Sequence, residues 1–320
     1  SGTTKLRGML EIVSSASEFE TVPIRRHEDV LLRRIYDRMP LKLDKIQFEN
    51  PFHKTFVLLQ AHFSRLTLPA DLAQDQRDIL NRVLTLLNAC VDVMSSGAML
   101  NAIVAMEISH MCVQAVWDRD SPLRQVPHFT AATIQRCQAR GIHDVYALAD
   151  VLPDMSQHER DELLQLNKRQ LADVATLTNE FPYVDIEFDI LDKEKLDSAS
   201  TIILQAKLER DVDEEEEEPS DPTAIAPFYP SPKMTAWWLV IGDPGTNSLL
   251  SIKRVTIAKT LDVRLEFMLP AGMHDKLKLY LMCDSYIGAD RELEVPALHV
   301  AQGEEDEELD DEDNIEMPDA

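Results

Sequence analysis

The chain is 320 residues long, with 44% hydrophobic residues, 28% charged residues and a net charge of -25 at pH 7. This composition excludes a largely disordered protein and predicts a sizeable core divided over two or three domains. The negative charge opposes free-standing binding to a phosphate backbone, because nucleic-acid modules carry excess Lys and Arg. Neither a charged-then-apolar leader nor a long uncharged apolar run is found, so we expect no secretion and no membrane partner.

Residues 1–127 show helical spacing of apolar side chains throughout and predict a helical bundle. Asn50 is the expected N-cap of one of its helices, because Pro51 occupies a first helical position, where a missing N–H is tolerated. The helices expected before the central one cover residues 5–14, 26–38, 51–66 and 74–94.

The stretch from Ser96 to Asp118 contains the most apolar helix, predicted at residues 98–117, and we expect the bundle to be built around it. Its polar exceptions, Glu107, His110, Gln114 and Asp118, stand three or four apart, which on a helix places them in one stripe. The polar positions considered for function are Asn101, Glu107, His110 and Gln114. They predict one narrow polar seam on an otherwise buried helix.

Residues 128–180 change to short helices separated by polar turns, and predict a small helix-loop-helix domain. The helices expected there cover residues 130–139, 144–151, 156–166 and 168–179. None of them is long enough to be stable alone, so we expect them to pack into one module.

After Pro182 the apolar period changes to two, which is typical of strands. About seven short strands in residues 181–302 predict an immunoglobulin-like or fibronectin-III-like β-sandwich. The expected strands are 184–190, 201–208, 236–241, 249–257, 261–267, 277–283 and 293–300. The acidic, proline-rich insert 209–233 predicts a long loop outside the core, and the acidic tail 303–320 predicts disorder.

Catalytic motifs are weak, and we expect no enzymatic activity, no cofactor and no metal. Glu107-x-x-His110 has the spacing used in di-metal carboxylate bundles, but the other predicted helices supply no second pair. A polar seam hydrogen-bonded inside the bundle or at its mouth is favoured over a metal-dependent activity. Residues 242–247 resemble a phosphate loop, but they lack a lysine and open no helix, so they predict a hairpin turn.

Four cysteines lie far apart with no Cys-x-x-Cys pair: Cys90, Cys112, Cys137 and Cys283. Three of them sit in apolar helix or strand contexts. This usage predicts free, buried thiols in a reducing compartment rather than a zinc site.

Three aromatic residues are candidates for partner binding: Trp237, Trp238 and Tyr280. Adjacent residues on a strand face opposite sides, so one tryptophan is expected in the core and the other outward. An outward-facing tryptophan is a typical anchor for a partner protein.

Six stretches carry a resemblance to a known family. They are LRGMLEIVSSASEFETVPIRRHED from Leu6, LLQAHFSRL from Leu58, ACVDVMSSGAMLNAIVAMEISHMCVQAVW from Ala89, VPHFTAATIQRC from Val126, WWLVIGDPGTNSLLSIKR from Trp237 and LYLMCDSYIGADRE from Leu279. The chain resembles the Sec63 homology unit that follows the helicase cores of Ski2-like helicases. More closely, it is similar to the second, C-terminal unit in the spliceosomal members of the family, the RNA helicases of the U5 particle that unwind the U4/U6 duplex.

The resemblance implies a nuclear protein with three parts: a helical bundle, a helix-loop-helix domain and an immunoglobulin-like domain. It implies as partners the preceding helicase cassette of the same chain and other spliceosomal proteins. The RecA-like motor of the family lies outside the resemblance, so we expect no ATPase activity from these residues.

Two functions follow as alternatives. In active members of the family the long bundle helix is a ratchet that contacts single-stranded RNA; the corresponding helix here, 98–117, has no Arg or Lys in its seam, whereas a strand-gripping surface needs positive charge and aromatic rings. A docking and regulatory platform for protein partners is therefore favoured over a single-stranded RNA guide, and we expect RNA binding in isolation to be weak or absent. The acidic blocks favour a solubilising role over mimicry of nucleic acid.

Overall fold

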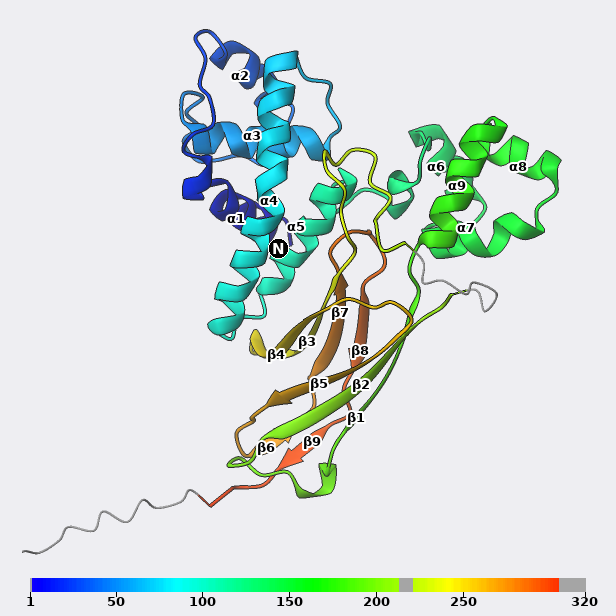
Figure 1. The fold of residues 1–320 in the computed structure, drawn as a ribbon. Helices are drawn as coiled ribbons and strands as arrows, with labels where there is room; N and C mark the ends of the chain where they lie inside the picture. The colour runs from blue at the N-terminus through cyan, green and yellow to red at the C-terminus, as the bar shows by residue number, and fades with distance from the viewer. Residues whose placement is uncertain (1, 213–220, 305–320) are drawn as a thin grey trace, which may run out of the picture.

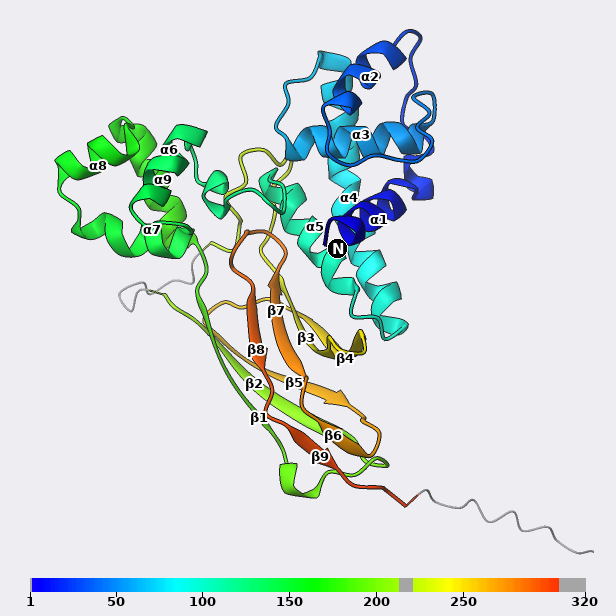
Figure 2. The ribbon, with the colours of Figure 1, turned by 180° about the vertical axis from the view of Figure 1, so that it is seen from behind.

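The computed structural model describes residues 2–212 and 221–304, and within them the chain combines nine α-helices with nine β-strands in antiparallel sheets (Figure 1). Figures 1 and 2 show the helices gathered at one end of the sheets, with the strands extending away from them. This confirms the mixed α and β composition that the change of apolar period predicts.

Each predicted helix is present, with ends that differ from the prediction by at most four residues. The helices are α1 Gly2–Ser14, α2 Asp29–Asp37, α3 Pro51–Phe63, α4 Ala70–Ser96, α5 Ala102–Gln114, α6 Ala131–Ala139, α7 Val145–Val151, α8 Gln157–Leu164 and α9 Lys168–Glu180. The predicted cap of α3 is confirmed, since Asn50 Oδ1 accepts a hydrogen bond from the Phe52 N–H at 2.9 Å. Local capping chemistry therefore sets this helix start.

The central helix α5 is shorter than predicted, because the apolar residues before it pack on a hairpin instead of continuing the helix. Ala98 has a φ of 53°, outside the helical region. The Leu100 N–H donates to Asn247 O at 3.2 Å, and the Leu249 N–H donates to Ala98 O at 2.9 Å. These bonds join the start of α5 to the turn between β3 and β4, so hydrophobicity alone gave the wrong helix boundary.

The strands form three antiparallel sheets, in the orders β1-β2-β5, β4-β3-β7-β8 and β6-β9. Their bounds are β1 Val184–Ile190, β2 Ile202–Arg210, β3 Trp237–Asp243, β4 Ser248–Val255, β5 Thr260–Phe267, β6 Gly272–His274, β7 Lys278–Cys283, β8 Arg291–Glu294 and β9 Leu298–Val300. The predicted hairpin turn at 242–247 is confirmed, since β3 ends and β4 begins within or next to it. The predicted strand 293–300 is in fact two strands in different sheets, separated by Pro296, which has no N–H for a ladder. The short β6 was missed because Gly272-Met273-His274 has no period-two pattern.

β3 is buried on both faces, with alternate residues in two different cores. Trp238 and Val240 belong to a core shared with the helices α1 to α5. Trp237, Leu239 and Ile241 belong to a second core shared with β1-β2-β5 and with the small helices α6 to α9. The sheet β4-β3-β7-β8 therefore lies between two apolar layers.

The segment 221–235 corrects one prediction, because it packs against the folded chain although the insert 209–233 was expected to stay outside the core. Ala224 is buried, and its N–H donates to Lys233 O at 2.7 Å. Tyr229 packs on the helical core, and its hydroxyl donates to Leu80 O at 2.8 Å. Four Pro residues in this segment and the acids of the insert hid these anchors in the sequence. Residues 213–220 of the insert and 305–320 of the tail lie outside the described residues, and so does the disorder predicted there.

Candidate functional site at the helix–sheet junction

The polar stripe of α5 faces the end of β7. His110 and Gln114 are 7% and 1% exposed. His110 Nδ1 lies 3.2 Å from Cys283 O, and Gln114 Nε2 donates to Ser285 O at 2.8 Å and to Ile225 O at 3.1 Å. His110 and Gln114 therefore lie on the same side of α5, and both contact main-chain carbonyls of the β part and of the segment before β3.

The other two members of the stripe are only partly buried. Asn101 precedes α5 and makes no side-chain capping bond. Burial raises the pKa of Glu107, and the nearby Asp290 carboxylate raises it further, against a lowering effect of His110. The four predicted side chains thus divide into two that hold the junction and two at its margin.

Asp290 completes the junction from the β side. Its Oδ1 accepts a hydrogen bond from the Cys283 N–H at 2.6 Å, and its Oδ2 lies 3.8 Å from His110 Nδ1. Burial raises the pKa of Asp290, with opposing effects from His110 and from the Cys283 N–H. In the ranges 2–212 and 221–304, no three His, Cys, Asp or Glu side chains are grouped so that they could hold a metal ion.

Arg65 is a junction residue that sequence reasoning missed. Its Nε donates to Ala115 O at 2.9 Å and its Nη2 to Gln114 O at 3.0 Å, so it satisfies carbonyls at the end of α5. Its guanidinium lies 4.0 Å from the centre of the Phe228 ring, and burial lowers the pKa of Arg65 to about 10. No local pattern marks this residue, because its partners at α5 are 49 and 50 positions away.

His62 is a second buried contact to α5. Its Nε2 lies 2.6 Å from Cys112 O, and burial lowers the pKa of His62 to about 4. The ring is therefore neutral at pH 7 and carries its proton on Nε2, because a carbonyl can only accept. This contact fixes α3 against α5.

The three predicted partner-binding aromatics are all buried within this chain. Trp237, Trp238 and Tyr280 are 2%, 3% and 8% exposed. The expectation that one tryptophan is exposed to solvent is wrong. Trp238 lies on the face of β3 that the helices cover, so its side chain is buried. Alternation along a strand gives the two faces but not what covers them.

Trp238 is held by a charged group on its ring face. The Arg254 guanidinium lies 3.8 Å from the centre of the Trp238 ring, and its Nη2 donates to Asp284 at 2.6 Å. Asp284 is fully buried and also accepts from Lys233 Nζ at 2.6 Å. Asp284 therefore ties β4 and the segment 221–235 to the end of β7.

The thiols are as predicted. Cys112, Cys137 and Cys283 are buried, Cys90 is half-buried, and all four are free. Burial raises the pKa of the Cys112 and Cys283 thiols well above the usual range, so both are neutral at pH 7.

None of the described helices is both long enough and apolar enough to cross a membrane.

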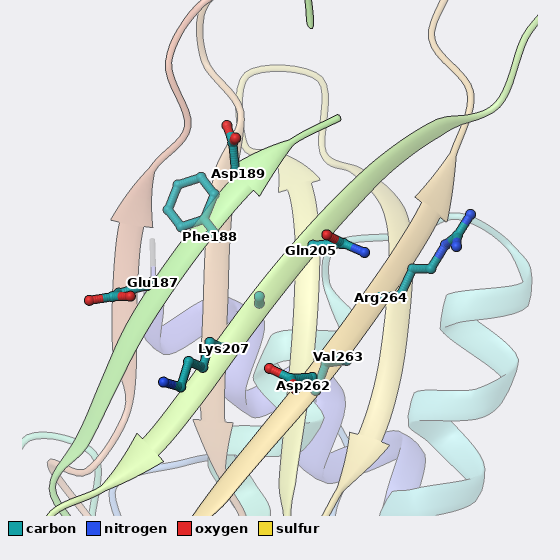
Figure 3. A pocket seen from close by; sticks show the side chains of 9 residues that line it. Glu187, Phe188, Asp189, Gln205, Lys207, Asp262, Val263 and Arg264 are labelled. Atoms are coloured by element: carbon teal, nitrogen blue, oxygen red, sulfur yellow. The ribbon is translucent and has the colours of Figure 1, made fainter. Parts of the chain in front are cut away.

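A shallow hollow of about 600 Å³ lies on the outer face of β1-β2-β5, away from the junction (Figure 3). Its polar lining comes from neighbouring strands, with Glu187 on β1, Lys207 on β2 and Asp262 on β5 in direct cross-strand register. This hollow was not predicted, because charged residues on alternate strand positions are the ordinary pattern of a solvated face.

Comparison with known proteins agrees with the resemblance read from the sequence. A family model for the Sec63 Brl domain matches residues 1–296. The chain is 46% identical to the pre-mRNA-splicing factor brr2 of Schizosaccharomyces pombe over 292 residues, which are 91% of this chain and 13% of that protein. It is 42% identical to the U5 small nuclear ribonucleoprotein 200 kDa helicase of Homo sapiens over 308 residues, which are 96% of this chain and 14% of that protein.

The similarity extends to plants. The DExH-box ATP-dependent RNA helicase DExH12 of Arabidopsis thaliana is 41% identical over 298 residues, which are 91% of this chain and 13% of that protein. The chain spans only 13% to 14% of the length of these three relatives. With a family model that covers nearly all of its described residues, the chain belongs to the Sec63 Brl domain family.

Proposed function

We propose that this chain is the non-catalytic Sec63 unit of a spliceosomal RNA helicase and acts as a docking and regulatory platform for proteins in pre-mRNA splicing, in the nucleus. The proposal is supported by relatives named as a pre-mRNA-splicing factor and as a U5 small nuclear ribonucleoprotein helicase. In this proposal the unit packs on the preceding helicase cassette of the same chain and binds other spliceosomal proteins. ATP hydrolysis belongs to the motor of the parent helicase.

We also propose the domain division 1–127, 128–180 and 181–302 for this unit, with the insert 209–233 and the tail 303–320. The third domain is proposed to be an immunoglobulin-like sandwich. In support, the sheets β1-β2-β5 and β4-β3-β7-β8 contribute apolar faces to one shared core.

The polar stripe on α5 is the observation that favours protein docking over RNA guidance. The helix Ala102–Gln114 contains no Lys or Arg. Its His110 and Gln114 side chains bond to carbonyls of the β part. A surface that grips a single strand needs free positive groups and stackable rings, so this helix is better suited to hold the unit together.

Binding assays with individually purified spliceosomal proteins and with the preceding helicase cassette test the proposal. We expect at least one of them to bind the 320-residue chain at micromolar or lower concentration. The matched control is the corresponding region of the activating signal cointegrator 1 complex subunit 3-like protein of Dictyostelium discoideum, which is 40% identical to this chain over 299 residues. No binding to any purified partner, or equal binding by the control, would contradict the proposal.

Titration with labelled single-stranded RNA is expected to be flat. The chain has a net charge of -25, and nonspecific binding depends on counterion release by Lys and Arg. At about 50 mM salt we expect a dissociation constant no tighter than about 100 µM. Fluorescence anisotropy measures it, and binding that is tight and falls steeply with salt would instead support an RNA guide.

A further inference from the structure

β1 has one edge without a strand partner among the described residues. The sheet order β1-β2-β5 places it at the edge, and its ladder runs to β2 alone. In Figures 1 and 2 it follows the outer side of the sheet from the small helices to the far end. An edge of this kind offers main-chain groups to another chain.

The ladder shows which residues offer those groups. The Asp211 N–H donates to Tyr183 O at 3.0 Å, and the Leu191 N–H donates to Ile203 O at 2.9 Å. Odd-numbered residues of this strand therefore bond to β2, and even-numbered residues direct their N–H and C=O groups to the opposite edge.

The open part of this edge is short and has closed ends. Val184 O accepts a hydrogen bond from Arg291 Nη1 at 2.6 Å. At the other end, the Ile190 N–H donates to the side chain of Asp189, at Oδ1, over 2.9 Å. Between these ends, Ile186 and Phe188 supply two N–H and two C=O groups. That length fits one added strand of about five residues.

Side chains beside the open edge are all acidic on the outer face. Asp185, Glu187 and Asp189 are exposed and stand at every second position. Lys207 lies opposite Glu187 in the register, but its Nζ is paired with Glu209 at 4.0 Å. The three carboxylates border the same face as the hollow of Figure 3. Asp189 is paired with Lys193 Nζ at 4.0 Å, whereas within the described residues Asp185 and Glu187 have no cationic side chain within 4.0 Å.

We propose that the free edge of β1 binds an extended segment of a partner protein that carries Lys or Arg at alternate positions. The added strand bonds to the main chain of Ile186 and Phe188. Its basic side chains lie beside Asp185, Glu187 and Asp189, because directly opposed residues share a face. Pairing with a second copy of β1 places carboxylates against carboxylates and is disfavoured. The inference rests on the proposed docking function and names one surface and one partner class for it.

The test uses the 320-residue chain and a fluorescent peptide, Lys-Val-Lys-Val-Lys-Val-Lys, titrated by anisotropy at about 50 mM salt, where charge pairing is weakly screened. We expect saturable binding that weakens with salt. Two control peptides separate the contributions: Glu replaces Lys in one, and alternate backbone nitrogens are methylated in the other, which removes its strand hydrogen bonds. Both are expected to bind at least about tenfold more weakly, the loss that 1.4 kcal/mol produces.

Two variants of the chain locate the site. Glu187→Lys is expected to weaken binding of the basic peptide at least about tenfold. Glu266→Lys makes the same charge change on the same face of β5, the strand at the other edge of the sheet. Its binding is expected to stay within about twofold of the wild type, because a charge away from the contact contributes little. Ile186→Pro removes an edge N–H without touching the ladder to β2 and is also expected to weaken binding. Circular dichroism verifies that each variant is folded.

The outcomes are distinguishable. Equal losses for Glu187→Lys and Glu266→Lys would mean general charge attraction, and unchanged binding of the methylated peptide would mean no strand addition; either result overturns the inference. Dimerisation of the chain alone, abolished by Ile186→Pro, would assign the edge to a second copy and overturn it as well. Failure of the peptide tests beside intact binding of purified spliceosomal proteins leaves the docking function standing, whereas loss of both removes the function itself.

Discussion

Replacing Lys54 with Met is expected to lower the free energy of unfolding by about 3–5 kcal/mol, because the change removes the fully buried counter-charge of two buried carboxylates. Lys54 lies on α3 with no exposed surface. Its Nζ donates to Glu28 at 2.8 Å and to Asp75 at 2.7 Å. Arg25 is the remaining cation and is itself partly exposed. Urea unfolding followed by far-UV circular dichroism measures the change.

Lys45→Met is the matched control. Lys45 is exposed on the loop before α3, so the same substitution there is expected to stay within about 0.5 kcal/mol of the wild type. A Lys54→Met variant that also stays within about 1 kcal/mol would mean that Arg25 alone is sufficient for the two carboxylates.

Acid titration tests the same network from the carboxylate side. Burial raises the pKa of Asp75, but hydrogen bonds from Arg25 and Lys54 oppose it, and the net pKa is lowered. A carboxyl group with a lowered folded-state pKa stabilises the fold above its unfolded value of about 3.9, and this stabilisation is lost as the pH falls through the folded-state pKa. Asp75→Asn is therefore expected to be less stable at pH 7 and to lose less further stability below about pH 4. A wild-type decline below pH 4 that is unchanged in the variant would contradict the assignment.

Replacing Trp238 with Ala is expected to lower the free energy of unfolding by about 3–5 kcal/mol and to weaken the attachment of the helices to the sheet. Trp238 is 3% exposed and belongs to the core that joins β3 and β7 to α1 to α5. The substitution empties this interface and removes the ring under the Arg254 guanidinium. We expect the wild type to unfold in one transition and the variant in two.

Trp238→Phe tests whether an aromatic ring of smaller volume is enough to keep the helices attached to the sheet. A phenyl ring keeps an aromatic face for Arg254 and much of the volume, so we expect less than half the loss seen with Ala and one transition. Equal losses for Phe and Ala would mean that the indole itself is required. A Trp238→Ala chain that unfolds in one transition close to that of the wild type would contradict the role of this residue in the interface.

The region around Gly242 illustrates what a local pattern can and cannot predict. Its place between two alternating strands predicted the hairpin turn correctly. The reason for glycine itself lies in the tertiary structure, because a Cβ there would be 2.6 Å from Leu100 Cδ1 and 2.8 Å from Ser248 O. The chain segment before α5 approaches the hairpin backbone at this point, and no spacing within residues 242–247 records that approach.

The candidate site divides in the same way. The spacing of Glu107, His110 and Gln114 correctly predicted a common stripe, since helical periodicity is a local property. Its partners, the carbonyls of Cys283 and Ser285, are 173 and 171 residues away. Periodicity gives the direction of a side chain but not the identity of the surface that meets it.

The sequence by itself determined the helices, most of the strands, the cap of α3, the alternation along β1 and β5, the free thiols and the family, because each depends on neighbouring residues or on an ordered set of matching stretches. Only the tertiary structure decided that Trp238 and Tyr280 are buried by helices, that Arg65 and Asp284 bind distant segments, and that β1 has an open edge. Burial and pairing depend on which surfaces meet across long chain separations. The central helix therefore was predictable as a buried, polar-striped element, whereas the binding of that stripe to the sheet was not.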